Sequence, residues 1–305
     1  MSEPASESVL QRPARSADRA QRGSAGSARL SLNQATIKYA DLPTALRVTR
    51  DAGIEAVGLW REPVAAVGLP TAAAMVADSG LRVSSLCRGG FVTARDEHLR
   101  RAALDENRRA IDETATLAAA AAPGSAPVLV LVAGGLPEGD RDLPAARARA
   151  ADAVGALVDD ADAAGVVLAI EPMHPMYAAD RGVISTLGQA LDVAEQFPAA
   201  TVGVVVDTFH VWWDPQLAGQ VRRAGPRIAS YQVCDWITPL PPDALLARGM
   251  MGEGHVDFPA VTRLVTDAGY AGDVEVEIFH QEVWDADPLD VAHRTVKAFD
   301  AHVGL

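Results

Sequence analysis

The sequence reads Val204-Val-Val-Asp207-Thr-Phe-His210 at the point that decides the fold: a run of valines ends at a carboxylate, and an imidazole follows three residues later. An apolar run without alternation is typical of a strand that is covered on both faces, as in parallel sheets. Asp207 would then lie at the strand's end, where loops gather. The pattern fits equally well an Asp that caps a helix, with His210 as a partly buried residue of its first turn.

Three more apolar runs end on a residue with an oxygen ligand, which favours a functional interpretation of Asp207. They are Val166-Val-Leu-Ala-Ile-Glu171, Ile228-Ala-Ser-Tyr-Gln232 and Val274-Glu-Val-Glu277. One such end is readily explained as an exposed polar side chain, but four in one chain are much harder to explain in that way. We therefore expect these four side chains to serve one site.

Short apolar runs alternate with helical segments from Leu30 to the end of the chain. The predicted strands are 30–33, 54–60, 81–87, 128–132, 166–171, 204–207, 228–232 and 274–277. This number of strands over about 275 residues predicts a (β/α)₈ TIM barrel, in which active sites form at the C-terminal ends of the strands. A doubly wound open sheet is the alternative, but no G-x-G-x-x-G or Walker-type loop follows the first strand.

The N-terminal segment differs from the rest of the chain. Residues 1–28 are rich in Ser, Ala, Arg and Gly and have no apolar period, which predicts a disordered tail. We expect residues 29–305 to form a single catalytic domain. Lysine occurs only as Lys38 and Lys297, so chemistry through a lysine imine is disfavoured.

Charge and composition exclude several classes of partner. A formal net charge of −13 disfavours nucleic acid and anionic membrane surfaces. No apolar run is long enough to span a bilayer, and the N-terminus has no apolar signal core. The two cysteines, Cys87 and Cys234, lie in or beside apolar runs and suggest buried thiols in a reducing compartment. The sequence therefore predicts a soluble, cytoplasmic protein, and it leaves a homo-oligomer open.

The four strand-end residues form a set of oxygen ligands. Glu171, Asp207, Gln232 and Glu277 together suit a hard divalent ion better than a structural zinc. Without a cation their carboxylates would repel one another at the same end of the barrel. We expect Mn²⁺, with Mg²⁺ or Co²⁺ as alternatives.

The chain from about Leu30 onward resembles the sugar phosphate isomerase/epimerase superfamily of xylose-isomerase-like TIM barrels. The motifs that carry the resemblance are Cys87-Arg-Gly-Gly-Phe91, Glu171-Pro-Met-His-Pro175, Asp207-Thr-Phe-His210, Gln232-Val-Cys-Asp235, Gly252-Glu-Gly254 and Glu275-Val-Glu-Ile-Phe279. Together they are specific for the superfamily but say little about the substrate.

The resemblance implies roles for the strand-end residues. Glu171, Asp207 and Glu277 match carboxylate metal ligands, and His210 matches a histidine that contacts substrate oxygens. Gln232 stands where many members carry a ligating histidine, and its carbonyl oxygen can still ligate. Glu275 lies two residues deeper on the same strand face as Glu277, so Glu277 is taken as the ligand.

Five further residues are candidates for the site. His174, in the loop after Glu171, could donate a proton or be an ordinary loop histidine. Arg88 could hold an anionic group or hydroxyl, or pair with a carboxylate. Arg248, in the loop after the seventh strand, is expected to touch the distal end of the substrate. Trp60 and Trp236 could stack on a sugar ring or pack in the core.

The resemblance implies a metal-dependent sugar isomerase or epimerase that abstracts a proton next to a carbonyl through a metal-stabilised enediolate. Glu171 and Glu277 would serve as bases on opposite faces of a small sugar, sugar phosphate or polyol. A lyase or dehydratase that acts on an oxidised sugar, such as a 3-keto-glycoside, shares the first step and remains the alternative. An apurinic endonuclease would need a His-rich zinc site and a basic groove. A non-catalytic partner subunit stays open as well.

Overall fold

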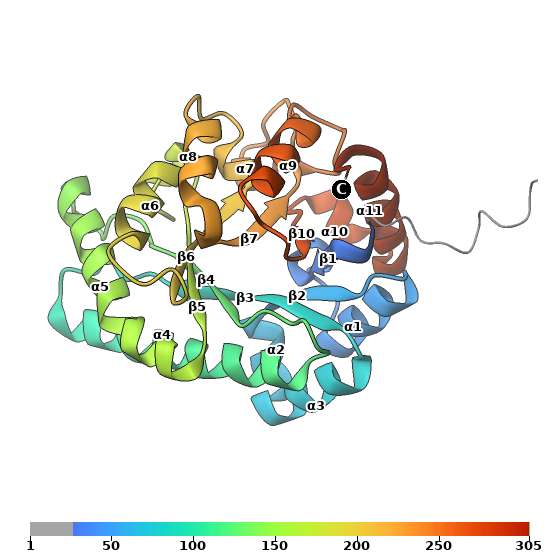
Figure 1. The fold of residues 1–305 in the computed structure, drawn as a ribbon, viewed down its shortest axis with the longest axis horizontal. Coiled ribbons are helices and arrows are strands. Elements are labelled where there is room, and N and C mark those ends of the chain that lie inside the picture. The colour runs from blue at the N-terminus through green and yellow to red at the C-terminus, as the bar shows by residue number, and fades with distance from the viewer. Residues whose placement is uncertain (1–26, 305) are drawn as a thin grey trace, which may run out of the picture.

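The computed structural model describes residues 27–304, in which eight parallel strands close into a barrel in the order β1-β10-β7-β6-β5-β4-β3-β2 (Figure 1). The predicted (β/α)₈ barrel is confirmed. The barrel strands are β1 (Leu30–Asn33), β2 (Ala56–Trp60), β3 (Arg82–Gly90), β4 (Val128–Val132), β5 (Val167–Glu171), β6 (Val202–Asp207), β7 (Ile228–Val233) and β10 (Val274–Val276). Residues 1–26, most of the predicted tail, lie outside the described part, and the single-domain assignment stays a prediction.

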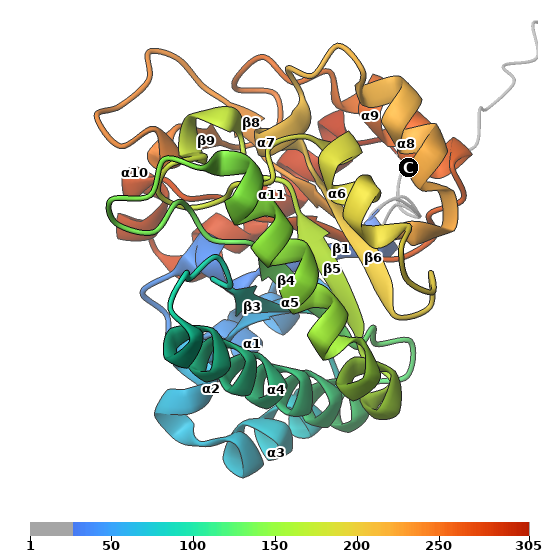
Figure 2. The ribbon, with the colours of Figure 1, turned by 90° about the vertical axis from the view of Figure 1, so that its left-hand side faces the viewer.

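Helices surround the barrel in both views, and the long helices α4 and α5 lie side by side on its outside (Figure 2). The α-helices are α1 (Leu42–Asp51), α2 (Arg61–Val67), α3 (Leu69–Ser79), α4 (Glu97–Ala120), α5 (Leu143–Ala164), α6 (Leu187–Ala194), α7 (Thr208–Val211), α8 (Leu217–Ala224), α9 (Phe258–Asp267), α10 (Gln281–Asp285) and α11 (Pro288–His302). The 3₁₀ helices are η1 (Ser27–Arg29), η2 (Gln34–Ile37), η3 (Pro175–Tyr177), η4 (Gly225–Arg227) and η5 (Ala244–Leu246). No helix of residues 27–304 is long and apolar enough to cross a membrane.

Aspartates cap the helices α1, α4, α5, α9 and α11. In each case the side chain accepts a hydrogen bond from a backbone N–H of the first turn, which satisfies a donor that the helix itself leaves unpaired. The capping residues are Asp41, Asp96, Asp142, Asp257 and Asp287. These short-range hydrogen bonds explain where the five helices begin.

A buried carboxylate, that of Glu275, lies inside the barrel below the C-terminal ends of the strands. The carboxylate of Glu275 on β10 accepts hydrogen bonds from Asn33 (2.5 Å), Ser84 (2.5 Å) and Ser85 (2.8 Å), which come from β1 and β3. A Cβ at Gly58 would come within 2.5 Å of this carboxyl group, so only glycine leaves room for it there. The tight hydrogen bonding explains how a carboxylate can be buried in this position.

One hairpin departs from the regular pattern. The strands β8 (Asp235–Trp236) and β9 (Arg248–Gly249) pair antiparallel after β7. We expected Arg248 in the loop after the seventh strand, and it lies on a short strand within that connection. The carboxylate of Asp235 organises this segment, because it accepts hydrogen bonds from the N–H groups of Gly252 (2.9 Å), Gly254 (2.8 Å) and Val256 (3.0 Å).

Candidate active site

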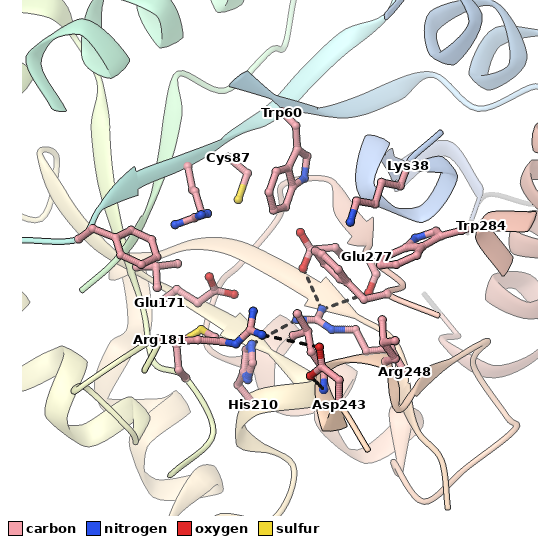
Figure 3. A pocket seen from close by; sticks show the side chains of 17 residues that line it. Lys38, Trp60, Cys87, Glu171, Arg181, His210, Asp243, Arg248, Glu277 and Trp284 are labelled. Atoms are coloured by element: carbon pink, nitrogen blue, oxygen red, sulfur yellow. Dashed lines mark hydrogen bonds and ion pairs between the residues drawn. The ribbon is translucent and has the colours of Figure 1, made fainter. Parts of the chain in front are cut away.

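A cavity of about 410 Å³ lies at the C-terminal end of the barrel strands (Figure 3). Glu171, the last residue of β5, and Glu277, the first residue after β10, reach into it from opposite sides. His210 and Arg248 lie between them, at the floor of the cavity. The strand ends thus converge as the barrel topology predicts.

Three of these side chains form a compact buried cluster. Ligand atoms of Glu171, Asp207 and His210 all lie within 4.8 Å of one another. Asp207 ends β6 and also caps α7, because its Oδ1 accepts a hydrogen bond from the N–H of Phe209 (2.8 Å). Both interpretations of the opening motif therefore hold: one oxygen of Asp207 caps the helix, and the other, Oδ2, faces the cluster.

Arg248 supplies a positive charge to this cluster. Its Nη1 donates to Oε2 of Glu277 (2.8 Å), to Oδ2 of Asp207 (3.2 Å) and to the carbonyl of Glu277 (3.2 Å). The side chain is only 2% exposed. We expected Arg248 to reach the distal end of the substrate, but the fold of the hairpin directs its guanidinium to the strand-end carboxylates.

Burial gives the two glutamates unusual proton affinities. It raises the pKa of Glu171 well above the usual range, and the charges of Asp207 and Glu277 add to the effect. Burial also raises the pKa of Glu277 to about 7, although the charge of Arg248 opposes the shift. A carboxyl group with such a pKa can take up or release a proton near neutral pH.

The hydrogen bonds around His210 select its tautomer. The backbone N–H of His174 donates to Nδ1 of His210 (3.1 Å), so this nitrogen carries no proton. Burial lowers the pKa of His210 well below the usual value, with the charge of Arg248 adding to the effect, so the ring is neutral. We infer that Nε2 carries the proton. Because the guanidinium of Arg248 also only donates, the 3.2 Å contact between its Nη2 and Nε2 then joins two donors and is not a hydrogen bond. In this tautomer His210 is a hydrogen-bond donor to the cavity.

Gln232 contributes an unused acceptor. It is the register partner of both Asp207 and Glu275 on neighbouring strands. Its Nε2 donates to Glu275 (3.2 Å), whereas its buried Oε1 has no hydrogen-bond partner within residues 27–304. A buried carbonyl oxygen without a partner costs free energy unless a ligand occupies it.

Two carboxylates of the compact cluster suit a divalent ion. Glu171 and Asp207 offer hard oxygen ligands, and the unpartnered Oε1 of Gln232 is a further hard oxygen on the neighbouring strand β7. Glu277, also expected as a ligand, lies outside the group of ligand atoms that are within 4.8 Å of one another. Asp207 Oδ2 and Glu277 Oε2 already accept from Arg248, but each carboxylate oxygen has a second lone pair. Neutral His210 could ligate through Nε2 only after its proton moved to another site.

The remaining candidates lie at different distances from the cluster. Arg88 and Trp60 line the cavity, and Arg88 stacks over the ring of Phe91 at 4.2 Å. The half-buried His174 packs between Trp236 (5.0 Å between ring centroids) and Trp213 (5.4 Å), outside the residues that line the cavity. Burial lowers the pKa of His174.

The sequence did not identify several residues of the cavity wall. They are Lys38, Arg181, Asp243, Phe279 and Trp284. Lys38 was considered only for imine chemistry, yet its ammonium lies 4.2 Å from the ring centroid of Trp284. Each of these residues belongs to a loop or short helix that follows a strand. In the sequence, only this position after a strand end could have indicated that they line the cavity.

Comparison with known proteins gives a family match and several similar structures. Residues 46–301 match the profile of a family described as xylose isomerase-like TIM barrel. The crystal structure of protein SMc04130 from Sinorhizobium meliloti 1021 has a TM-score of 0.85 and 44% sequence identity, and the alignment covers 90% of this chain and 98% of that chain. The IOLI protein, crystallised with a zinc atom, has a TM-score of 0.76 and 21% identity over 90% of this chain and 98% of its own.

A curated protein is also similar over part of its length. An L-ribulose 3-epimerase from Mesorhizobium japonicum is 27% identical over 138 residues, which are 45% of this chain and 42% of that protein. The match therefore spans less than half of the curated relative.

Proposed function

Because the chain belongs to the xylose isomerase-like TIM barrel family, we propose that it is a metal-dependent sugar epimerase or isomerase that moves a proton next to a carbonyl group. The observation that carries the proposal is the pair of buried glutamates, Glu171 and Glu277, on opposite sides of one cavity. The partial similarity to an L-ribulose 3-epimerase supports a ketose as the substrate.

Glu171, Asp207, Gln232 and Glu277 would hold the ion, and Mn²⁺ suits this oxygen-rich set best. The similar IOLI structure was solved with a bound zinc atom, which supports metal binding by a protein of this fold. Once bound, a divalent ion polarises a substrate carbonyl and so acidifies the neighbouring C–H bond.

The proton transfer belongs to the two glutamates. With a pKa of about 7, Glu277 is substantially ionised at neutral pH and can remove a proton from carbon. Glu171, whose pKa burial raises well above the usual range, can hold a proton and deliver it to the opposite face. Return of a proton to the face from which it left gives no net change, whereas delivery to the other face inverts the centre.

Two donors can stabilise the oxygen that becomes negative. The Nε2–H of His210 and the Nη2 group of Arg248 lie 3.2 Å apart, and a single substrate oxygen near both could accept from each. Such preorganised donors in a buried site typically contribute about 10²- to 10³-fold in kcat. Arg88 at the mouth is proposed to hold another oxygen of the sugar, and Trp60 to contact its ring.

The test is solvent-deuterium uptake into ketoses incubated with the protein and Mn²⁺. We expect deuterium at the carbon next to the carbonyl, together with the epimer, and a rate that falls as the pH is lowered because protonation of Glu277 removes the base. Glu277→Gln should keep an oxygen ligand but lose the exchange, whereas Glu282→Gln on the exposed start of α10 should retain it. Exchange at the native rate in Glu277→Gln would reject this residue as the base.

The same experiment separates elimination from epimerisation. A 3-keto-glycoside that takes up deuterium and then releases its aglycone would assign the lyase chemistry that the sequence left open. The first proton transfer is common to both reactions, so the fate of the neighbouring C–O bond decides between them.

A further inference from the structure

A second cavity of about 320 Å³ adjoins the first and shares three wall residues with it: Lys38, Trp60 and Phe279. We propose that this cavity is a subsite for a second, neutral sugar ring, so that a ketose carrying a glycosyl group binds more tightly than the free monosaccharide. The inference rests on the proposed function for the reacting ring and names the part of the substrate beyond it.

The first argument is an unpartnered donor. Gln34 in η2 lines the second cavity and is only 2% exposed. Its Oε1 accepts a hydrogen bond from the N–H of Trp60 (3.3 Å), whereas its buried Nε2 has no hydrogen-bond partner within residues 27–304. A buried amide donor left without a partner destabilises the protein. A hydroxyl oxygen of a bound ligand would satisfy it.

The second argument is the aromatic wall between the two cavities. The rings of Trp60 and Phe279 meet edge to face with centroids 5.7 Å apart. Trp60 is held in place because its Nε1 donates to Asn33 (2.8 Å). Aromatic walls with a few placed polar groups are typical of ligand sites, and the apolar C–H face of a sugar ring can pack against such rings.

The third argument is the balance of charge. The polar groups of the second cavity are the Gln34 amide, the Lys38 ammonium and the carboxylate of Glu62. Lys38 forms no ion pair with a carboxylate in the described part of the chain, so its three N–H donors remain available. Hydroxyl groups both donate and accept and can therefore satisfy all three side chains. A phosphate would be attracted to Lys38 but repelled by Glu62.

The test measures binding without turnover. The protein with Mn²⁺ is titrated with D-fructose and with glucosyl-fructoses of different linkage, and binding is followed by saturation-transfer NMR and calorimetry. We expect at least one glucosyl-fructose to bind about tenfold more tightly than fructose, which corresponds to about 1.4 kcal/mol. Saturation transfer should reach protons of both rings.

Two variants examine the donors. Gln34→Met and Lys38→Met should each reduce the preference for the disaccharide several-fold, whereas Lys297→Met changes the only other lysine, on α11, and should keep the native preference. If Gln34→Met lowers the melting temperature strongly, the test relies on Lys38→Met, because the side chain of Lys38 is exposed and its replacement should not affect folding.

The outcomes separate the subsite from the proposed function. Equal binding of fructose and every glucosyl-fructose would overturn the subsite even if ketoses exchange deuterium. A disaccharide preference without deuterium exchange into any sugar would support the subsite and reject the epimerase. Tighter binding of fructose 6-phosphate than of the disaccharides, lost in Lys38→Met, would overturn the neutral ring in favour of an anion site.

Discussion

At the scale of single residues, Arg248 decides the electrostatics of the site. One guanidinium group contacts Asp207 and Glu277, while the side chain of Glu171 forms no hydrogen bond or ion pair in the described part of the chain. Three carboxylates and one arginine would leave an excess of negative charge in a buried space if all were ionised, and the raised pKa values of Glu171 and Glu277 indicate that protons offset it when no cation is bound. A divalent ion would neutralise that excess, so Arg248 and the ion would share the carboxylates.

Arg248→Met tests this balance. Breaking a buried ion pair by removing one partner typically costs about 3–5 kcal/mol, so the unfolding free energy in chelator should fall by that amount. Mn²⁺ should then raise the melting temperature more in the variant than in the native protein, because three unpaired carboxylates gain more from a cation. Both quantities come from thermal and urea unfolding with and without Mn²⁺.

Arg222→Met is the matched control, since Arg222 is exposed on α8. It should change neither the unfolding free energy nor the response to Mn²⁺ by more than about 0.5 kcal/mol. If Arg248→Met loses its response to Mn²⁺, the arginine helps to hold the ion and does not share the carboxylates with it.

At the scale of elements, the β8–β9 hairpin positions Arg248. Asp235 holds the hairpin and the following loop together, because its two oxygens accept backbone N–H groups from both sides of the turn. The guanidinium reaches the carboxylates only because β9 pairs with β8 directly after the barrel strand β7. The motif Gly252-Glu-Gly254 fits this arrangement, since a Cβ at Gly254 would come within 2.1 Å of a backbone carbonyl.

Asp235→Asn is expected to destabilise the protein. The asparagine keeps one oxygen, but its NH₂ group would face N–H donors, which leaves buried donors unpaired at a cost of about 1–3 kcal/mol each. Urea unfolding should show this loss. Asp257→Asn, at the start of α9, should be nearly neutral because Asn caps helices as well as Asp does. Equal stability of the two variants would show that Asp235 does not organise the hairpin.

At the scale of the whole molecule, closure of the barrel depends on its first strand. β1 pairs with both β2 and β10 and so closes the barrel between its second and its last strand. Just before it, Arg29 donates to the carbonyl of Gly272 (2.8 Å). The N-terminal boundary of the folded part should therefore be sharp.

Two truncations test that boundary. Removal of residues 1–26 should leave the melting temperature unchanged, because that stretch has no apolar pattern to bury. Removal of residues 1–33 also deletes β1 and should abolish cooperative unfolding, since β2 and β10 lose their shared neighbour. A drop of several degrees with the shorter truncation would show that the first residues contribute to the fold.

The sequence by itself determined the barrel and its strand ends. Local patterns carry this information: apolar runs predict buried strands, aspartates mark helix starts, and the residue that ends a strand is known once the strand is known. In a closed parallel barrel those ends must meet at one face, so the convergence of Glu171, Asp207 and Glu277 followed from topology. Some boundaries differed by a few residues, as at β3, which continues to Gly90.

Only the tertiary structure decided which groups contact one another within that site. Arg248 lies 41 residues from Asp207 and 29 from Glu277, and no local pattern predicts that its guanidinium joins them. The tautomer of His210 depends on a backbone N–H in another loop, and the second cavity depends on side chains from η2, β2 and the segment after β10. Hydrogen bonds, charge pairs and cavities depend on distances between segments remote in the chain, which the folded barrel alone establishes.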